Sequence, residues 1–149
     1  MPRLATVRDA PNLARIINAA FVVEAFFKIG DRTTPDEVGA LMSAGGEFLV
    51  VDDVACLYLK CSGERAYFGM LSVLPGRQRG GLGRRLIEAA EARARERGCR
   101  AMDIHIVNLR EELFPYYRAA GYVESGSLPF PDPDKASRPC FMIVMTKPL

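Results

Sequence analysis

A glycine- and arginine-rich segment in the middle of the chain holds the residues best suited to chemistry. An apolar run ends at Val73, Pro75 prevents its extension as a strand, and an amphipathic helical pattern begins at Leu82. The first turn of a helix leaves backbone N–H groups without partners, and the helix dipole makes this end positive. Around this turn lie three glycines, which give a ligand room, and four arginines, which add positive charge: Gly80, Gly81, Gly83, Arg77, Arg79, Arg84 and Arg85. The combination predicts a diphosphate-binding site at a helix N-terminus.

Two common phosphate-binding motifs do not fit this segment. A P-loop requires a lysine and a hydroxyl residue after its last glycine, and neither follows Gly83. A dinucleotide-binding turn requires G-x-G-x-x-G, and the third glycine is missing after Gly81-Leu82-Gly83. A plain turn with exposed arginines is the simpler interpretation. The order of strand, proline, glycines and helix favours the ligand site.

The motif Gln78-Arg79-Gly80-Gly81-Leu82-Gly83 matches the acyl-CoA pattern [QR]-x-x-G-x-[GA] of the GNAT acetyltransferases at every fixed position. The flanking elements, and the element order over nearly the whole chain, also resemble that family. The resemblance implies an N-acetyltransferase that uses acetyl-CoA as cosubstrate and needs no metal. It places the CoA site at the following residues: Leu71, Ser72, Val73, Gln78, Arg79, Gly80, Gly81, Leu82, Gly83 and Arg84.

A second family signature, Y-x-x-x-G-[FY], is matched by Tyr117-Arg118-Ala119-Ala120-Gly121-Tyr122. The resemblance implies that Tyr117 lies near the CoA sulfur and protonates the departing thiolate. A phenol, with an ordinary pKa of about 10, is a competent acid toward a thiolate. The alternative is that Tyr117 is a core aromatic residue like its neighbour Phe114.

In this family the strand before the motif is bulged and splayed from its neighbour. The backbone groups that the splay frees would belong here to Leu71, Ser72 and Val73. The resemblance implies that they bind pantetheine and polarise the acetyl carbonyl, as an oxyanion hole does.

The sequence departs from the family pattern at two positions. Some members carry a general-base glutamate where this chain has Tyr67, and a tyrosine is a poor base at neutral pH. Other residues that could take the amine proton are His105, Glu24 and Asp31, or a chain of water molecules could do so. Many members also carry an asparagine that contacts pantetheine where this chain has Arg110. Asn108, two residues earlier, is the candidate for that contact.

The periodicity of the chain predicts the elements that must position these residues. Apolar runs predict strands at 4–7, 48–51, 55–61, 66–73, 102–107, 122–124 and 141–146. Caps and helical spacing predict helices after Asp9, after Thr34, from 82 to 97 and over 110–120. A proline-rich loop holding Pro129 is expected before the last strand. The order is that of an α+β fold with a mostly antiparallel mixed sheet flanked by helices.

The helix that follows the glycines is expected to have one buried and one solvated face. Its exposed face is predicted to carry two i,i+4 ion pairs, Arg84 with Glu88 and Glu91 with Arg95. This pairing favours a solvated surface over a nucleic-acid interface, as does the net charge of only +2.

The composition fits one domain spanning residues 1–149, with 49% hydrophobic residues. The four cysteines form no C-x-x-C pair, which argues against a zinc site. No apolar run approaches the roughly 18 residues of a membrane span. We therefore expect a cytoplasmic protein with no membrane or nucleic-acid partner. The sequence leaves the oligomeric state open, a homodimer included.

Two functions remain open at this level. The first is acetyl transfer to the amine of a small molecule or peptide, and the resemblance implies that residues 21–33 and 125–138 bind the acceptor. The second is a catalytically silent module that binds acyl-CoA for regulation. The presence of Tyr117 favours the enzyme. The absence of a general-base glutamate, where this chain has Tyr67, leaves the silent module as an alternative.

Overall fold

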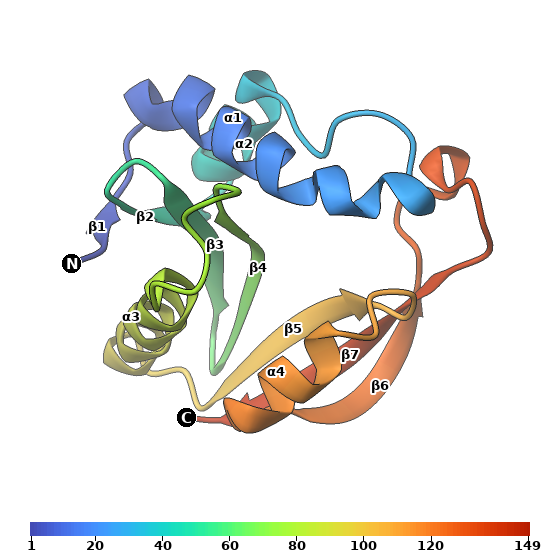
Figure 1. Ribbon diagram of the computed structural model, residues 1–149. Helices are drawn as coiled ribbons and strands as arrows, with labels where there is room; N and C mark the ends of the chain where they lie inside the picture. The colour runs from blue at the N-terminus through green and yellow to red at the C-terminus, as the bar shows by residue number, and fades with distance from the viewer.

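The computed structural model describes residues 1–149 and shows one sheet with helices on both faces (Figure 1). The strands are β1 (Arg3–Leu4), β2 (Glu47–Val51), β3 (Ala55–Ser62), β4 (Arg65–Val73), β5 (Ala101–Val107), β6 (Val123–Pro129) and β7 (Phe141–Pro148). The α-helices are α1 (Ala10–Ala20), α2 (Pro35–Ser43), α3 (Leu82–Glu96) and α4 (Leu113–Ala119). Three short 3-10 helices are η1 (Val7–Asp9), η2 (Phe21–Phe26) and η3 (Pro133–Lys135). The predicted order of strands and helices is confirmed.

The seven strands are arranged in the order β1-β2-β3-β4-β5-β7-β6. Every neighbouring pair is antiparallel except β4 and β5, which run parallel. The expected mostly antiparallel mixed sheet is therefore confirmed. The one parallel pair joins a half made of β1 to β4 to a half made of β5 to β7.

The parallel pair is short, and the two strands then separate. β4 and β5 pair only at Arg65–Ala101, Ala66–Met102 and Tyr67–Asp103. Beyond this point β4 continues beside β3 and β5 continues beside β7, so a gap opens between the two halves (Figure 1). The splay implied by the family resemblance is present.

β4 also carries an irregularity within the separated part. The register passes from Cys56–Ser72 to Tyr58–Gly69, so β4 holds one residue more than β3 over this interval. Met70 lies there with a left-handed φ of 52°, which is costly for a residue with a side chain. Such a bulge turns the strand and leaves backbone groups outside the ladder.

Each face of the sheet has its own hydrophobic core, as β2 illustrates. Leu49 and Val51 face the core that contains α3 and α4, whereas Phe48 and Val50 face the core that contains α1 and α2. This alternation follows from the period of two along a strand. The helices therefore cover both faces of the sheet, and the gap between β4 and β5 lies between these two layers (Figure 1).

The prediction of a solvated ion pair between Glu91 and Arg95 is wrong. Its side chain is buried, and its carboxylate accepts hydrogen bonds from Tyr122 Oη at 2.7 Å and from Lys147 Nζ at 3.0 Å. A charged group can be buried when it is paired and hydrogen-bonded. The pair predicted between Arg84 and Glu88 is also absent, and both residues are exposed. Glu91 thus fastens α3 to β7, across the two halves of the sheet.

Two further boundaries differ from the sequence-based prediction. β6 continues to Pro129, where a loop was expected, because β6 is the last strand of the sheet and an edge position tolerates proline. α4 begins at Leu113 rather than at residue 110, and Pro115 lies in its first turn, where a missing N–H costs nothing.

We expect Tyr122→Phe to destabilise the fold by about 1–3 kcal/mol, since it leaves a buried carboxylate oxygen of Glu91 without its donor. Denaturant unfolding measures this change. Tyr58→Phe is the matched control, because no hydrogen bond of the Tyr58 hydroxyl is present. Equal stability of Tyr122→Phe and wild type would contradict the role assigned to Glu91.

Candidate active site

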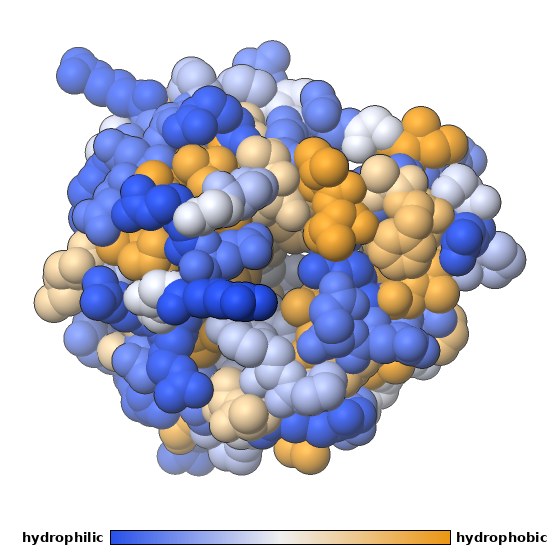
Figure 2. Space-filling model, in the orientation of Figure 1, coloured by the Kyte–Doolittle hydropathy of each residue, from blue (hydrophilic) through white to orange (hydrophobic).

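A cavity of about 1170 Å³ opens where β4 and β5 separate. Its walls come from η2, β4, the loop before α3, the first turn of α3, β5, α4 and the loop after β6. In the space-filling view a hollow with hydrophobic and hydrophilic borders lies near the centre of the visible face (Figure 2). The cavity thus connects the N-terminus of α3 with the side of the sheet covered by η2.

The first turn of α3 forms one end of the cavity. Gly81 caps the helix with a left-handed φ of 76°, and no side chain bonds to the first-turn N–H groups. No acidic residue lies in that turn. The end of the helix therefore offers backbone donors and a positive dipole without a protein anion to satisfy them.

Most of the residues predicted to bind CoA lie together on this part of the wall. Those that line the cavity are Leu71, Val73, Gln78, Arg79, Gly81, Leu82, Gly83 and Arg84. Met70 and Leu71 have no opposite residue in the β3–β4 ladder, so the bulge places backbone groups at the gap. Arg77 also lines the cavity, whereas Arg85 does not.

Three residues of the predicted set lie off the cavity wall: Ser72, Gly80 and Asn108. Ser72 is buried, and its hydroxyl donates to the Met70 carbonyl at 2.9 Å. The Asn108 amide oxygen accepts a hydrogen bond from the Phe141 N–H at 2.9 Å. Asn108 therefore joins the end of β5 to the start of β7, a contact between distant segments that no local pattern reveals.

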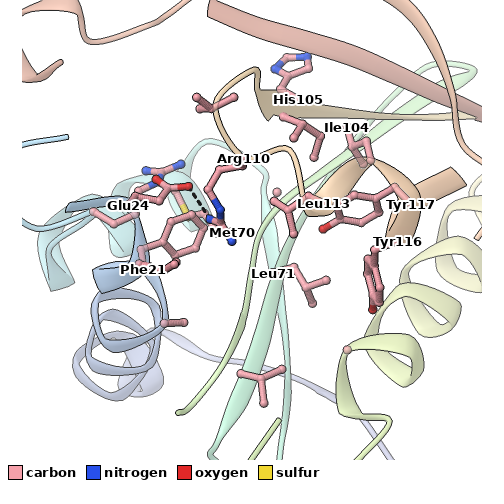
Figure 3. Close-up of a pocket in the computed structure, with 18 of the residues that line it drawn as sticks. Phe21, Glu24, Met70, Leu71, Ile104, His105, Arg110, Leu113, Tyr116 and Tyr117 are labelled. Carbon is pink, nitrogen blue, oxygen red and sulfur yellow. Dashed lines mark hydrogen bonds and ion pairs between the residues drawn. The ribbon is translucent and has the colours of Figure 1, made fainter. Parts of the chain in front are cut away.

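Gly83 lies close to the side chains that face it across the cavity, so a side chain at this position would crowd them. A Cβ atom at this position would lie 3.1 Å from Tyr116 Oη and 3.9 Å from Leu71 Cδ2. Figure 3 shows Tyr116 pointing from α4 toward α3. Tyr116 was not singled out in the sequence, because only the fold brings it opposite Gly83.

Tyr117 lies on the same wall, beside the gap. Its side chain is 6% exposed, and its hydroxyl has no hydrogen-bond partner in the protein. Every fully buried side-chain nitrogen or oxygen in the protein has a hydrogen-bond partner. Because the Tyr117 hydroxyl has none, it is not fully buried, and it is open to the cavity that Tyr117 lines. Figure 3 shows it directed inward, past Leu113. Burial raises the pKa of Tyr117, so the phenol stays protonated at neutral pH.

An ion pair crosses the cavity from η2 to the segment before α4. Arg110 Nη1 lies 2.9 Å from Glu24 Oε2, and Arg110 Nε lies 2.9 Å from Glu112 Oε2 (Figure 3). Burial raises the pKa of Glu24 even though Arg110 opposes this shift. The second oxygen of Glu24, Oε1, has no protein partner and is not enclosed. Arg110 stands where many family members carry an asparagine, and this difference was the one sign in the sequence of its contact with Glu24.

His105 and Tyr67 form another part of the wall, on the η2 side of the sheet. Their ring centroids are 4.7 Å apart, and no hydrogen bond of the imidazole is present. Burial lowers the pKa of His105, against an opposing effect of Asp103, so the ring is neutral at pH 7. Asp31, the remaining base candidate, is exposed and does not line the cavity.

The roof over this side comes from two segments distant in sequence. Phe21, Lys28 and Arg32 contribute from the η2 region, while Phe130 and Asp132 contribute from the loop after β6. Arg32 lies over the Phe21 ring, with 5.5 Å between the guanidinium carbon and the ring centroid. The predicted acceptor segments, 21–33 and 125–138, are therefore adjacent in space.

No group of three or more His, Cys, Asp and Glu side chains is arranged to hold a metal ion. None of the helices combines the length and the apolar character needed to cross a membrane.

The sequence model of the acetyltransferase (GNAT) domain matches residues 44–124, which is more than half of the chain. The matched segment contains β4, the glycine-rich turn, α3 and Tyr117. A search of curated protein sequences gave no significant match.

Several solved structures share the fold over the whole chain. The ribosomal-protein-alanine N-acetyltransferase from Brucella melitensis has a TM-score of 0.77 at 23% identity, covering 100% of this chain and 99% of that one. A ribosomal-protein alanine N-acetyltransferase from Escherichia coli has a TM-score of 0.77 at 17% identity, with 99% and 92% covered.

A third structure contains the cosubstrate. A GNAT family acetyltransferase from Elizabethkingia anophelis with acetyl-CoA bound has a TM-score of 0.64 at 18% identity, covering 76% of this chain and 82% of that one. At these identities the likeness establishes the fold alone. The domain match and the shared fold, with one splayed parallel pair in a mostly antiparallel sheet, together show that this chain belongs to the GNAT acetyltransferase family.

Proposed function

We propose that this chain is an acetyl-CoA-dependent N-acetyltransferase acting on the amine of a small molecule or peptide. One observation carries the proposal: a single cavity joins the free N-terminus of α3 to the charged wall beneath η2, with the open hydroxyl of Tyr117 between them. An enzyme that brings two substrates together from opposite sides of a sheet needs such a passage. The neighbour that holds acetyl-CoA supports the choice of cosubstrate.

In this proposal the diphosphate of acetyl-CoA is bound by the first turn of α3. The backbone N–H groups near Gly81 and Gly83 have no partner within the protein, so an anion there gains hydrogen bonds without displacing others. The exposed arginines Arg79 and Arg84 add positive charge. The cosubstrate then extends along β4 toward the bulge, where the backbone at Leu71 would face the acetyl carbonyl and stabilise the charge that develops on its oxygen.

Tyr117 donates the proton that the departing thiolate requires. Its raised pKa keeps the hydroxyl protonated, so it is available as a donor throughout the working pH range. The same shift makes complete transfer to a thiolate of ordinary pKa about 8.5 less favourable. We therefore expect a contribution near the lower end of the usual range for general acids, about a hundredfold.

Glu24 accepts the proton lost by the attacking amine. Its carboxylate lines the cavity, keeps one oxygen free of protein partners, and has a raised pKa, which strengthens it as a base. Arg110 holds the other oxygen and so fixes the side chain. His105 is neutral and also open to the cavity, and it is the competing candidate.

The catalytically silent acyl-CoA-binding module is the alternative function. It requires the same diphosphate site but neither Tyr117 nor Glu24. The decisive experiment incubates the protein with acetyl-CoA and a panel of small amines and peptides. CoA release with an acetylated product supports the enzyme, whereas binding of acetyl-CoA without product supports the module.

The diphosphate site is tested by Gly83→Glu, which adds bulk and negative charge beside the phosphates. Acetyl-CoA at a hundredfold excess over Kd should stabilise the wild type by about 2.7 kcal/mol, and this gain should vanish in the variant. The readout is the rise in Tm. Gly39→Glu is the control, because an added Cβ at this helical glycine meets nothing within 4 Å. A rise retained in Gly83→Glu would place the diphosphate elsewhere.

The general acid is tested by Tyr117→Phe. We expect kcat to fall about a hundredfold with little change in Tm or acetyl-CoA affinity, because the hydroxyl has no protein partner to lose. Tyr122→Phe should show the opposite pattern, with reduced stability and retained turnover at low temperature, because its hydroxyl serves Glu91. A rate of Tyr117→Phe within threefold of wild type would remove this residue from the mechanism.

The general base is tested by its pH profile. A base must be deprotonated to act, so kcat should fall as the pH drops through the pKa of Glu24, which lies above its ordinary 4.5. Glu24→Gln should abolish this acidic limb and lower kcat by about a hundredfold or more. His105→Gln should keep the limb. If His105→Gln loses the limb while Glu24→Gln keeps it, the base is His105.

A further inference from the structure

Two half-buried cations on the η2 side of the cavity have no carboxylate partner. Lys28 and Arg32 line the cavity, and neither takes part in a salt bridge or a side-chain hydrogen bond. Arg110, the other cation on this side, is paired with Glu24 and Glu112. Lys28 and Arg32 are therefore positive charges that the folded protein itself does not neutralise.

The two cations are near enough to affect each other. The pKa of Lys28 is lowered first by burial and then by the charge of Arg32. Glu24 and Asp132 raise the pKa of Lys28, and Lys135 lowers it further. No carboxylate oxygen lies within 4 Å of the Lys28 ammonium group. Bringing like charges together away from water is unfavourable, and an anion bound between them would relieve the cost.

Hydrogen bonds fix the backbone of the segment that carries the two cations. Lys28 belongs to an isolated β-bridge with Ala136, and the neighbouring Ile29 N–H donates to the Lys135 carbonyl at 2.8 Å. Asn18 binds both backbone groups of Thr33, beside Arg32, at 2.9 and 3.0 Å. Two independent tethers thus fix the segment that carries the cations, which is the preorganisation a binding site needs.

Glu24 supplies the opposite charge on the same wall. Its free oxygen is open to the cavity that Lys28 and Arg32 also line, and the positive charges of both oppose the rise of its pKa. A ligand with an amine beside an anionic group matches this arrangement of one anion and two cations.

We propose that the acetyl acceptor is a small primary amine bearing a carboxylate or phosphonate next to its amine, and that Lys28 and Arg32 bind that anionic group. The proposal rests on the proposed acetyltransferase function. Glu24 contacts the amine, which attacks in its neutral form, and takes the proton that the nitrogen loses once its bond to the acetyl carbon has formed. Amines without an adjacent anion, including the N-terminal amine of a peptide, leave the two cations unpaired and bind more weakly.

The test compares acceptors that differ in one charge. The wild type is assayed with acetyl-CoA against the standard L-amino acids, their α-carboxamides, short peptides and aminoalkylphosphonates, with CoA release and product mass as readouts. We expect at least one anionic amine to exceed its uncharged counterpart in kcat/KM by about tenfold to a hundredfold, as loss of a charged hydrogen bond would predict. The carboxylate and phosphonate arms identify the anion.

Variants connect this preference to the two cations. Lys28→Gln and Arg32→Gln should each raise KM for the anionic amine about tenfold or more and leave KM for its carboxamide unchanged. Arg100→Gln, at an exposed and unpaired arginine outside the cavity, should leave both values unchanged. The Tm of each variant, alone and with acetyl-CoA, separates a folding defect from a binding defect.

Three results would overturn the inference. If the carboxamides or the peptides are acetylated as well as the anionic amines, the acceptor class is wrong and the acetyltransferase function stands. If both cation variants keep the preference for the anion, its binding site lies elsewhere. If no amine is acetylated although acetyl-CoA raises the Tm, the proposed function fails together with the inference.

Discussion

The brevity of the β4–β5 pairing is the constraint on which the rest of the structure depends. Only three residue pairs join the two halves of the sheet before the strands separate. A continuous sheet would bury its backbone groups in a ladder and separate the helices on its two faces. The separation instead opens a passage through the sheet, and the bulge at Met70 directs the end of β4 along it. All proposed chemistry takes place within this passage.

A sheet opened in this way needs support from outside the strand ladder. The buried carboxylate of Glu91 on α3 is bonded to Tyr122 and Lys147, which belong to the other half of the sheet. On the opposite face the Glu24–Arg110 pair joins η2 to the segment before α4. Because charge-assisted hydrogen bonds are strong and directional, these contacts join the two halves in addition to the three ladder pairs.

The two ends of the cavity differ in how their charges are supplied. At the α3 end, positive potential comes from backbone donors and exposed arginines, which suits a highly charged diphosphate that stays partly in water. At the η2 end, half-buried Lys28 and Arg32 lie near a buried carboxylate, an arrangement that suits a small ligand with charges of both signs. Tyr117 lies between them, protonated because it is buried.

The sequence by itself determined the order of the elements, the helix after the glycines and the two motifs that contain Gly81 and Tyr117. These features could be predicted because hydrophobic periodicity, turn residues and helix caps depend on residues close together in the chain. The tertiary structure decided which of these residues share a wall. In the folded chain Glu91 is buried and accepts a hydrogen bond from Tyr122, and Asn108 accepts one from the Phe141 backbone. β6 extends to Pro129 along the edge of the sheet. It also brought Arg110 to Glu24, 86 residues away. Such contacts join residues that are distant in the chain, so their partners appear only when the strands are arranged and the buried charges must find hydrogen bonds.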